Sequence, residues 1–339
     1  MNVANNAALP PVDLNLEMEY GLPSPIITAR RQSVLRIGAG TKEYALKHVQ
    51  LPLEKLLHLL SIMEFMRARG FTSFPSIVPN LKGEYFLPRE SGIYYLLHWI
   101  PGRESNFQNH SDLILYAVVL GRLHRLTKGF YPAGRDWQER WSTGLQKLAA
   151  LDCSHTSRLA GLREVVPEII RAGTKSLSLL QETEVSRSLR QPAVVCHHDL
   201  SSRNFLISTG NRGFLIDFEC ARPDVPMLDL AQLLERVMLW HNWDLTLALQ
   251  LLAAYSEENP LTRGDLGVLL AFLYFPRPLW GLGRSPVIKD SNPQAVRERV
   301  KRAEKTLTSH QAIDRLSALL GYNVYNSGDN SLAPDSFIR

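Results

Sequence analysis

Residues 194–219, VVCHHDLSSRNFLISTGNRGFLIDFE, decide the fold of this chain. The stretch predicts an apolar strand, the polar loop HHDLSSRN, a short strand, a turn with glycine and a second apolar strand that ends on a carboxylate. Phosphoryl transfer from ATP requires one carboxylate that accepts or orients the proton of the acceptor hydroxyl. It also requires an amide and a second carboxylate that hold Mg²⁺ on the phosphates. Asp199, Asn204 and Asp217 fit these roles in that order.

The spacing of the three residues gives the pattern its specificity. Asp-x-x-x-x-Asn followed by an aspartate at a strand end is the order of the catalytic loop and metal-binding motif of protein kinases. The alternative is an ordinary loop in which Asp199 and Asn204 only cap turns. The flanking strands and Asp217 favour catalysis, with Asp199 as the base and with Asn204 and Asp217 as ligands of Mg²⁺.

The first hundred residues predict a small antiparallel sheet with one helix. Residues 25–49 contain the β-rich pieces IITAR, SVLRI and EYALKHV, with the turn GAGTK before the last of them. Apolar residues then recur at helical spacing from Leu53 until Gly70. YFLP and IYYLLHWI complete a predicted sheet of five strands.

The remainder of the chain predicts a mostly helical lobe, because Pro101-Gly102 ends the last strand and apolar helical periodicity follows. Helices are expected from about residue 111 and at 137–152, 158–181, 228–239, 242–256, 262–273 and 293–319. The expected organisation is an extension (1–24), a small lobe (25–100), a large lobe (101–322) and a disordered tail (323–339).

HHDLSSRNFL followed by LIDFE resembles the aminoglycoside phosphotransferase and choline kinase branch of the protein-kinase-like fold. The segments LLHWIPGRES (96–105), VVLGRLHRLTKGF (118–130) and PMLDLAQLL (226–234) extend this resemblance. It implies an α+β fold of two lobes, use of ATP and Mg²⁺, and a hydroxyl-bearing acceptor. It also implies that Asp229 reaches back to N–H groups of the catalytic loop, whereas the position alone is equally that of a helix cap.

Within that branch the chain is most similar to the CotS-like spore coat proteins, the bacterial spore kinase family. The similarity rests on EYALKHV (43–49), on LGRLHRLTKGF and on YFPRPLWGLG (274–283). It implies association with the spore coat, with other coat proteins as partners, after synthesis in the cytoplasm.

Lys47 in YALKHV has the small-apolar-Lys pattern of the third kinase strand, where the ammonium clamps the nucleotide phosphates. The alternative is an exposed lysine on a strand. Its carboxylate partner is expected from the helix that follows, with Glu64 preferred and Glu54 as the alternative.

His98, Trp99 and Ile100 are expected to present backbone N–H and C=O groups to the adenine edge, because the small sheet ends there. The chain departs from the family in the phosphate loop, where TARRQS contains no glycine. Such a loop cannot bring consecutive N–H groups close to phosphates. Arg30 or Arg31 can take over as charged donors.

Two histidines precede Asp199. His197 is expected to pack and brace the loop, whereas His198 either contacts substrate or lies on the loop surface. Ser202 and Arg203 are candidate donors to the γ-phosphate.

Composition excludes several classes of protein. The net charge of +5 suits an anionic ligand, but the basic residues are scattered, which argues against nucleic-acid binding. The longest apolar run, 266–276, is too short to span a membrane, and the N-terminus lacks the pattern of a signal peptide. Three cysteines without CxxC spacing argue for synthesis in a reducing compartment.

Three functions remain open. The first is an ATP- and Mg²⁺-dependent phosphotransferase acting on a hydroxyl of a small molecule or coat component, which the intact Asp199, Asn204 and Asp217 favour. The second is a weakly active or inactive kinase-shaped scaffold of the spore coat, which the glycine-poor loop favours. The third is an aminoglycoside kinase. Arginines in the large lobe, Arg236 among them, argue against a polycationic acceptor.

Overall fold

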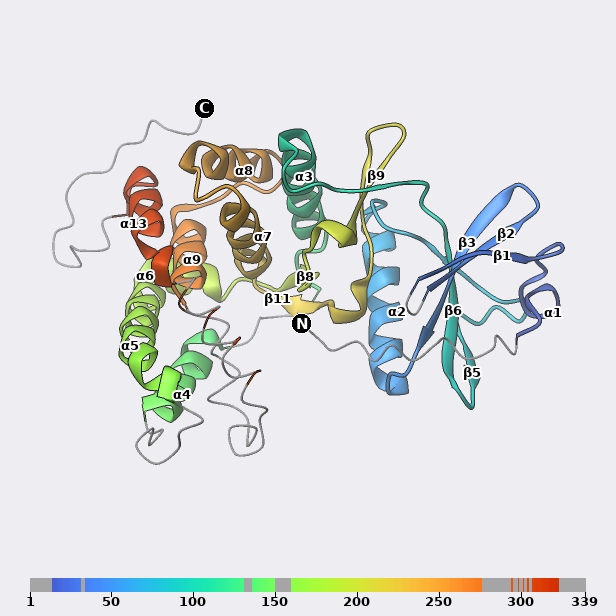
Figure 1. The fold of residues 1–339 in the computed structure, drawn as a ribbon, viewed down its shortest axis with the longest axis horizontal. Helices are drawn as coiled ribbons and strands as arrows, with labels where there is room; N and C mark the ends of the chain where they lie inside the picture. Colours follow the sequence, from blue (N-terminus) through green and yellow to red (C-terminus); the bar gives the residue numbers. More distant parts are fainter. Residues whose placement is uncertain are drawn as a thin grey trace.

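The computed structural model describes residues 14–31, 34–130, 136–149, 160–275 and 307–322, with single helical positions between 294 and 304. Figure 1 shows a small lobe built around a sheet beside a larger lobe of helices. The expected tail (323–339) and the segment 276–283 lie outside the described residues.

The small lobe is a six-stranded antiparallel sheet with the order β1-β2-β3-β6-β4, in which β5 also pairs with β6. The strand β2 alternates buried and more open residues, whereas the central strands β3 and β6 each contain four consecutive buried residues, as strands covered on both faces do. The strands are β1 (Ile26–Arg31), β2 (Val34–Ala39), β3 (Lys42–Val49), β4 (Ile77–Val78), β5 (Leu87–Arg89) and β6 (Gly92–His98). Sequence analysis predicted all of them except β4, which has only two residues.

A short helix, α1 (Leu16–Tyr20), lies in the range expected to be a separate extension. Asn15 caps its first turn by accepting a hydrogen bond from the N–H of Met18. Leu16 and Tyr20 join the buried cluster on one face of the sheet together with Leu35 and other strand residues. This segment therefore packs as part of the small lobe.

The helix α2 (Leu53–Ala68) lies between the sheet and the large lobe (Figure 1). Its inner face is entirely apolar and belongs to the same buried cluster as the large-lobe helices; its members are Leu56, Leu59, Ile62, Met63 and Met66. Burial of these side chains couples the two lobes, because each contributes about 1.5–3 kcal/mol when fully buried.

The chain crosses between the lobes at Pro101-Gly102. The strand β7 (Gly102–Glu104) pairs with β9 (Phe205–Ser208), which also pairs with β10 (Gly213–Leu215). A Cβ on Gly102 would lie 2.5 Å from the carbonyl oxygen of Ile207, so only glycine permits this approach. A second pair, β8 (Val194–Cys196) with β11 (Arg222–Asp224), holds the loop between them.

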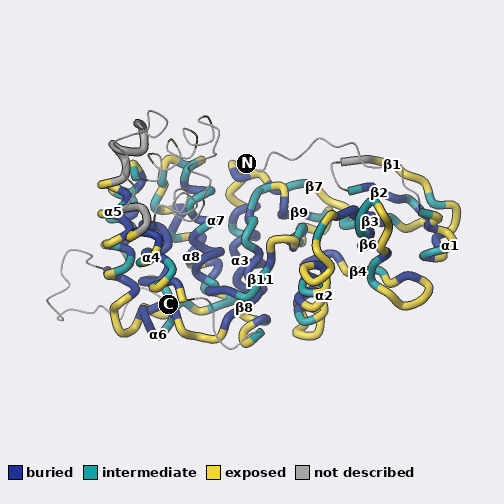
Figure 2. Tube along the Cα trace, turned by 90° about the horizontal axis from the view of Figure 1, so that it is seen from below, coloured by how far each residue is buried: buried dark blue, intermediate teal, exposed yellow. Residues whose placement is uncertain are grey.

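The large lobe consists of helices whose buried faces form one core (Figure 2). The helix α9 is buried on nearly all sides. The described helices are α3 (His110–Leu126), α4 (Trp137–Ala149), α5 (Ala160–Gln181), α6 (Thr183–Leu189), α7 (Pro226–Trp240), α8 (Leu245–Glu258), α9 (Arg263–Tyr274) and α13 (His310–Leu319). The short α6 was not predicted, and the helix expected at 293–319 is described as a continuous helix only in its last part.

The predicted fold class is confirmed: the protein is α+β, with an antiparallel small lobe that carries one long helix and a mostly helical large lobe. In the described part of the chain, no helix is both long enough and apolar enough to cross a membrane.

Candidate active site between the lobes

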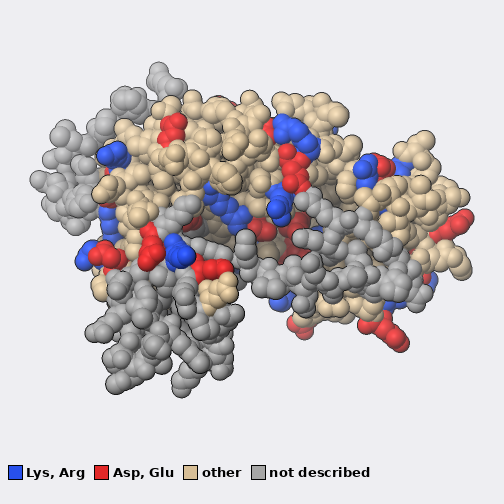
Figure 3. Space-filling model, in the orientation of Figure 1, with Lys and Arg blue, Asp and Glu red and all other residues tan. Residues whose placement is uncertain are grey.

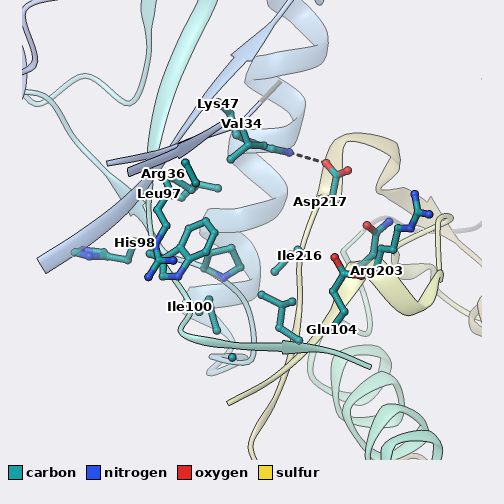
Figure 4. A pocket seen from close by; sticks show the side chains of 17 residues that line it. Val34, Arg36, Lys47, Leu97, His98, Ile100, Glu104, Arg203, Ile216 and Asp217 are labelled. Atoms are coloured by element: carbon teal, nitrogen blue, oxygen red, sulfur yellow. Dashed lines mark hydrogen bonds and ion pairs between the residues drawn. The ribbon is translucent and has the colours of Figure 1, made fainter. Parts of the chain in front are cut away.

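A cavity of about 340 Å³ opens where the two lobes meet (Figure 4). This volume lies in the usual range of small-ligand sites. Both lobes supply its walls. The small lobe contributes Val34, Arg36, Ala45, Lys47 and Leu97, the crossing contributes His98, Trp99 and Ile100, and the large lobe contributes Arg203, Asn204, Ile216 and Asp217.

Lys47 and Asp217, 170 positions apart, meet across this cavity. The Nζ of Lys47 donates to Asp217 Oδ1 at 2.6 Å and to Glu219 Oε1 at 2.7 Å (Figure 4 draws the first contact). Burial alone would lower the pKa of Lys47, but neighbouring Tyr95, Asp217 and Glu219 hold it above its ordinary value. The ammonium therefore stays charged where a phosphate would contact it.

The predicted helical partner of Lys47 is wrong. Glu64 is exposed on α2 and lines a different hollow with Leu57, and Glu54 is exposed as well. The inner face of α2 is apolar, so it offers no carboxylate to the cleft. Glu219 of LIDFE takes this place. Sequence reasoning missed it, although an acidic residue two positions after Asp217 was a visible signal.

Asp199 lies in the loop after β8 with 44% of its side chain exposed. Its Oδ2 accepts a hydrogen bond of 2.9 Å from Nδ2 of Asn204. Its Oδ1 lies 3.3 Å from both terminal nitrogens of Arg236, which projects from α7. The predicted base is thus held on two sides, and the contact with Arg236 was not foreseen.

Asp229 holds the loop that carries Asp199 by two hydrogen bonds. The N–H groups of His197 and His198 donate to the two carboxylate oxygens of Asp229 at 2.5 and 3.0 Å, which confirms the predicted reach of this residue. Burial alone would raise the pKa of Asp229, but the hydrogen bond with His124 and the neighbouring His198 hold it well below its usual range.

His197 is fully buried, and its Nε2 lies 2.8 Å from the carbonyl oxygen of Ile216, so it braces the loop as predicted. Burial lowers the pKa of His197, which keeps the ring neutral near pH 7.

Neither expectation for His198 holds, because its side chain is buried. It has a positive φ of 64° and its Nδ1 lies 3.0 Å from a terminal nitrogen of Arg222. The ring therefore points away from the cleft.

Asn204 and Asp217 offer the oxygen ligands that Mg²⁺ prefers. The amide nitrogen of Asn204 donates to the backbone carbonyl and to the carboxylate of Asp199, both at 2.9 Å. Among the described residues, Asn204 Oδ1 and Asp217 Oδ2 have no hydrogen-bond donor. The backbone links the two residues, since the N–H of Ile216 donates to the carbonyl of Asn204 at 3.0 Å. The donor set therefore fits a hard divalent cation.

The segment 98–100, which leads from the small lobe to the large one, lines the cavity as predicted. The backbone N–H groups of two of its residues, however, are hydrogen-bonded within the protein. The N–H of His98 donates to the carbonyl of Ser76, and the N–H of Trp99 donates to the carbonyl of Glu43. Among the described residues, no backbone acceptor takes the N–H of Ile100. That N–H is the remaining donor here for an adenine edge.

Arg36, on β2, lines the same cavity, and its guanidinium lies 4.7 Å from the ring centroid of Trp99. Sequence analysis did not single it out. The side chains of Arg30 and Arg31, and residues 32–33 between β1 and β2, lie outside the described part.

Two bacterial proteins are similar to this chain in sequence. An uncharacterized protein of Deinococcus radiodurans is 25% identical over 292 residues, which are 78% of either chain. Spore coat protein S of Bacillus subtilis is 22% identical over 261 residues, covering 72% of this chain and 74% of that protein.

Among solved structures, an aminoglycoside phosphotransferase from Alicyclobacillus acidocaldarius has a TM-score of 0.74 at 21% identity, covering 94% of this chain and 99% of that one. A spectinomycin phosphotransferase in complex with ADP and spectinomycin has a TM-score of 0.61 at 14% identity, covering 88% and 96%. Both structures share the fold described above. The sequence pattern of the phosphotransferase enzyme family matches residues 27–266, more than half of the chain, and the protein therefore belongs to that family.

Proposed function

We propose that this protein is an ATP- and Mg²⁺-dependent phosphotransferase that transfers the γ-phosphate to a hydroxyl group. The observation that carries the proposal is the position of Asn204. Its amide nitrogen holds Asp199, while its amide oxygen and Asp217 are available at the wall of the cavity that Lys47 enters. The proposed base, the proposed metal ligands and the proposed phosphate clamp therefore lie in one cleft.

Nucleotide binding follows from the walls of that cavity. Apolar side chains from both lobes, including Val34, Leu97 and Ile216, suit the faces of an adenine ring. The N–H of Ile100 is available to its edge. Lys47 then reaches the phosphates, and the fold neighbour crystallised with ADP supports the same use of the cleft.

Each of these residues has its own role in the phosphoryl transfer. Asp199 accepts the proton of the acceptor hydroxyl as the acceptor oxygen bonds to the γ-phosphorus. The bond between that phosphorus and the bridging oxygen breaks, and ADP leaves with the bridging oxygen. Lys47 stabilises negative charge on the phosphates. Asn204 and Asp217 would hold Mg²⁺, which neutralises phosphate charge when bound.

Association with the spore coat is supported by the similarity to spore coat protein S. The second candidate, a coat scaffold without turnover, is favoured by the absence of glycine from the β1–β2 connection. The polar groups Asp199, Asn204 and Asp217 argue for the enzyme, because a buried amide that holds one carboxylate beside a second one has no evident use in a structural part.

Replacing Lys47 with methionine is expected to weaken Mg²⁺·ATP binding by about 10- to 100-fold, since hydrogen bonds to charged groups contribute about 1.5–3 kcal/mol. Titration calorimetry measures the affinity. Lys55→Met, at an exposed position of α2, is the matched control and should bind like the wild type. Equal affinity of Lys47→Met and wild type would contradict the proposed clamp.

A further inference from the structure

The feature that the proposed function leaves unexplained is the arginine beside the base. Arg236 has 41% of its side chain exposed and, among the described residues, is paired only with Asp199. Both terminal nitrogens approach the single oxygen Oδ1 at 3.3 Å, which is longer than a strong charge-assisted bond. A guanidinium has five N–H donors, so most of its capacity is not used by this contact.

The geometry of Asp199 places this guanidinium next to the incoming hydroxyl. Oδ2 accepts the 2.9 Å hydrogen bond from Asn204, whereas the contacts of Oδ1 are longer, at 3.3 Å, so Oδ1 has room to accept the acceptor hydroxyl. Oδ1 is the atom that Arg236 contacts. Any group attached to the carbon next to the reacting hydroxyl therefore comes within reach of a fixed positive charge.

Within one turn of Arg236, the face of α7 that carries this arginine has no carboxylate. Gln232, Arg236 and Trp240 follow one another at four-residue steps and thus share one face of the helix. Trp240 is 65% exposed, one turn beyond Arg236. Glu235 lies about 100° around the helix axis from Arg236. We call the three residues the open face of α7.

Three carboxylates of the cleft are engaged by cationic side chains, and a fourth, Glu104 on β7, lines the cavity. Asp199 is paired with Arg236, and Asp217 and Glu219 are both paired with Lys47. Figure 3 shows acidic and basic side chains close together between the lobes on the visible face. A cationic acceptor would bring a like charge towards Arg236 and find no unpaired carboxylate among these three.

We propose that the acceptor is an anionic alcohol, whose carboxylate or phosphate binds Arg236 while its hydroxyl reaches Asp199, and that Arg236 selects acceptors by charge. This inference rests on the proposed phosphotransferase function. It makes Arg236 a specificity residue, and the exposed ring of Trp240 provides an apolar wall for the rest of the acceptor.

The test uses three small alcohols of different charge: D-glycerate (anionic), glycerol (neutral) and choline (cationic). ADP release is measured with the full chain, Mg²⁺·ATP and constant free Mg²⁺. An alcohol that binds the site changes this rate, either by accepting phosphate or by displacing water from Asp199. In the wild type, glycerate is expected to change the rate at about 10- to 100-fold lower concentration than glycerol. Choline is expected to require the highest concentration of the three.

Variants separate charge selection from a merely structural role. Arg236→Gln is expected to abolish the preference for glycerate, Arg236→Glu to reverse it in favour of choline, and Arg236→Lys to retain part of it. Arg171→Gln, which removes an equally cationic side chain on α5 paired with Glu168, should keep the wild-type preference.

The outcomes are distinguishable from failure of the proposed function. A wild type that binds Mg²⁺·ATP but responds equally to the three alcohols, or not at all, or prefers choline, overturns the anionic acceptor alone. The anionic acceptor is overturned in the same way if Arg236→Gln slows the reaction with all three alcohols by one common factor. A wild type that fails to bind Mg²⁺·ATP overturns both proposals.

Discussion

Asp199→Asn is expected to lower turnover by about 10²–10⁴-fold, the usual cost of losing a general base. Mg²⁺·ATP affinity should remain close to that of the wild type, because Asp199 contacts Asn204 and Arg236 and not the nucleotide side of the cavity. ADP release at saturating nucleotide gives the rate, and calorimetry gives the affinity.

Glu64→Gln is the matched control for this substitution, because it makes the same change from carboxylate to amide outside the cleft. It should leave both rate and affinity unchanged. Loss of nucleotide binding in Asp199→Asn, with normal turnover of the fraction that still binds, would contradict the role assigned to Asp199.

Asp229→Ala is expected to destabilise the fold by about 2–5 kcal/mol, because it leaves one buried and one partly buried N–H group without an acceptor. Those donors belong to His197 and His198, so the loop before Asp199 loses its support. Denaturant unfolding monitored by circular dichroism measures the change. Asp229→Asn should cost less, since its amide oxygen can still accept one of the two bonds.

The same carboxylate predicts a dependence of stability on pH. The pKa of Asp229 is lower in the folded state than the value of about 3.9 in an unfolded chain. Its contribution is therefore present above about pH 4 and is lost as the pH falls below that value. Wild type should lose stability more steeply than Asp229→Ala over this acidic range. Parallel curves for the two proteins would contradict this assignment.

The order of motifs along the chain was enough to predict the two lobes, with Lys47 in the small lobe and Asp217 in the large one. Strand periodicity and the Pro101-Gly102 break located the sheet and the crossing, because these signals are local. The strand β4, with two residues, and the short helix α6 carry too little periodicity to be recognised.

Side-chain partners were harder to predict, because they depend on the orientation of whole elements. The helix α2 turns Glu64 outward and presents apolar residues to the cleft, so Glu219 pairs with Lys47. Likewise, several predicted helices carry arginines, and nothing in the sequence indicates that Arg236 is the one that contacts Asp199. His198 has a positive φ and a buried ring, and the sequence HHDL does not indicate this backbone conformation.

Asp217 and Asn204 are proposed to hold Mg²⁺·ATP in this cleft, and thermal unfolding with and without Mg²⁺·ATP tests this role. Asp217→Asn is the informative variant, because asparagine also tolerates the left-handed backbone at this position, where φ is 67°. A ligand that binds only the native state stabilises it by about 2.7 kcal/mol at a concentration of 100 Kd. Mg²⁺·ATP is expected to raise the Tm of the wild type in a concentration-dependent way, and Asp217→Asn is expected to lose the Mg²⁺-dependent part of the rise. No rise in the wild type at millimolar Mg²⁺·ATP, or an equal rise in the variant, would contradict this role.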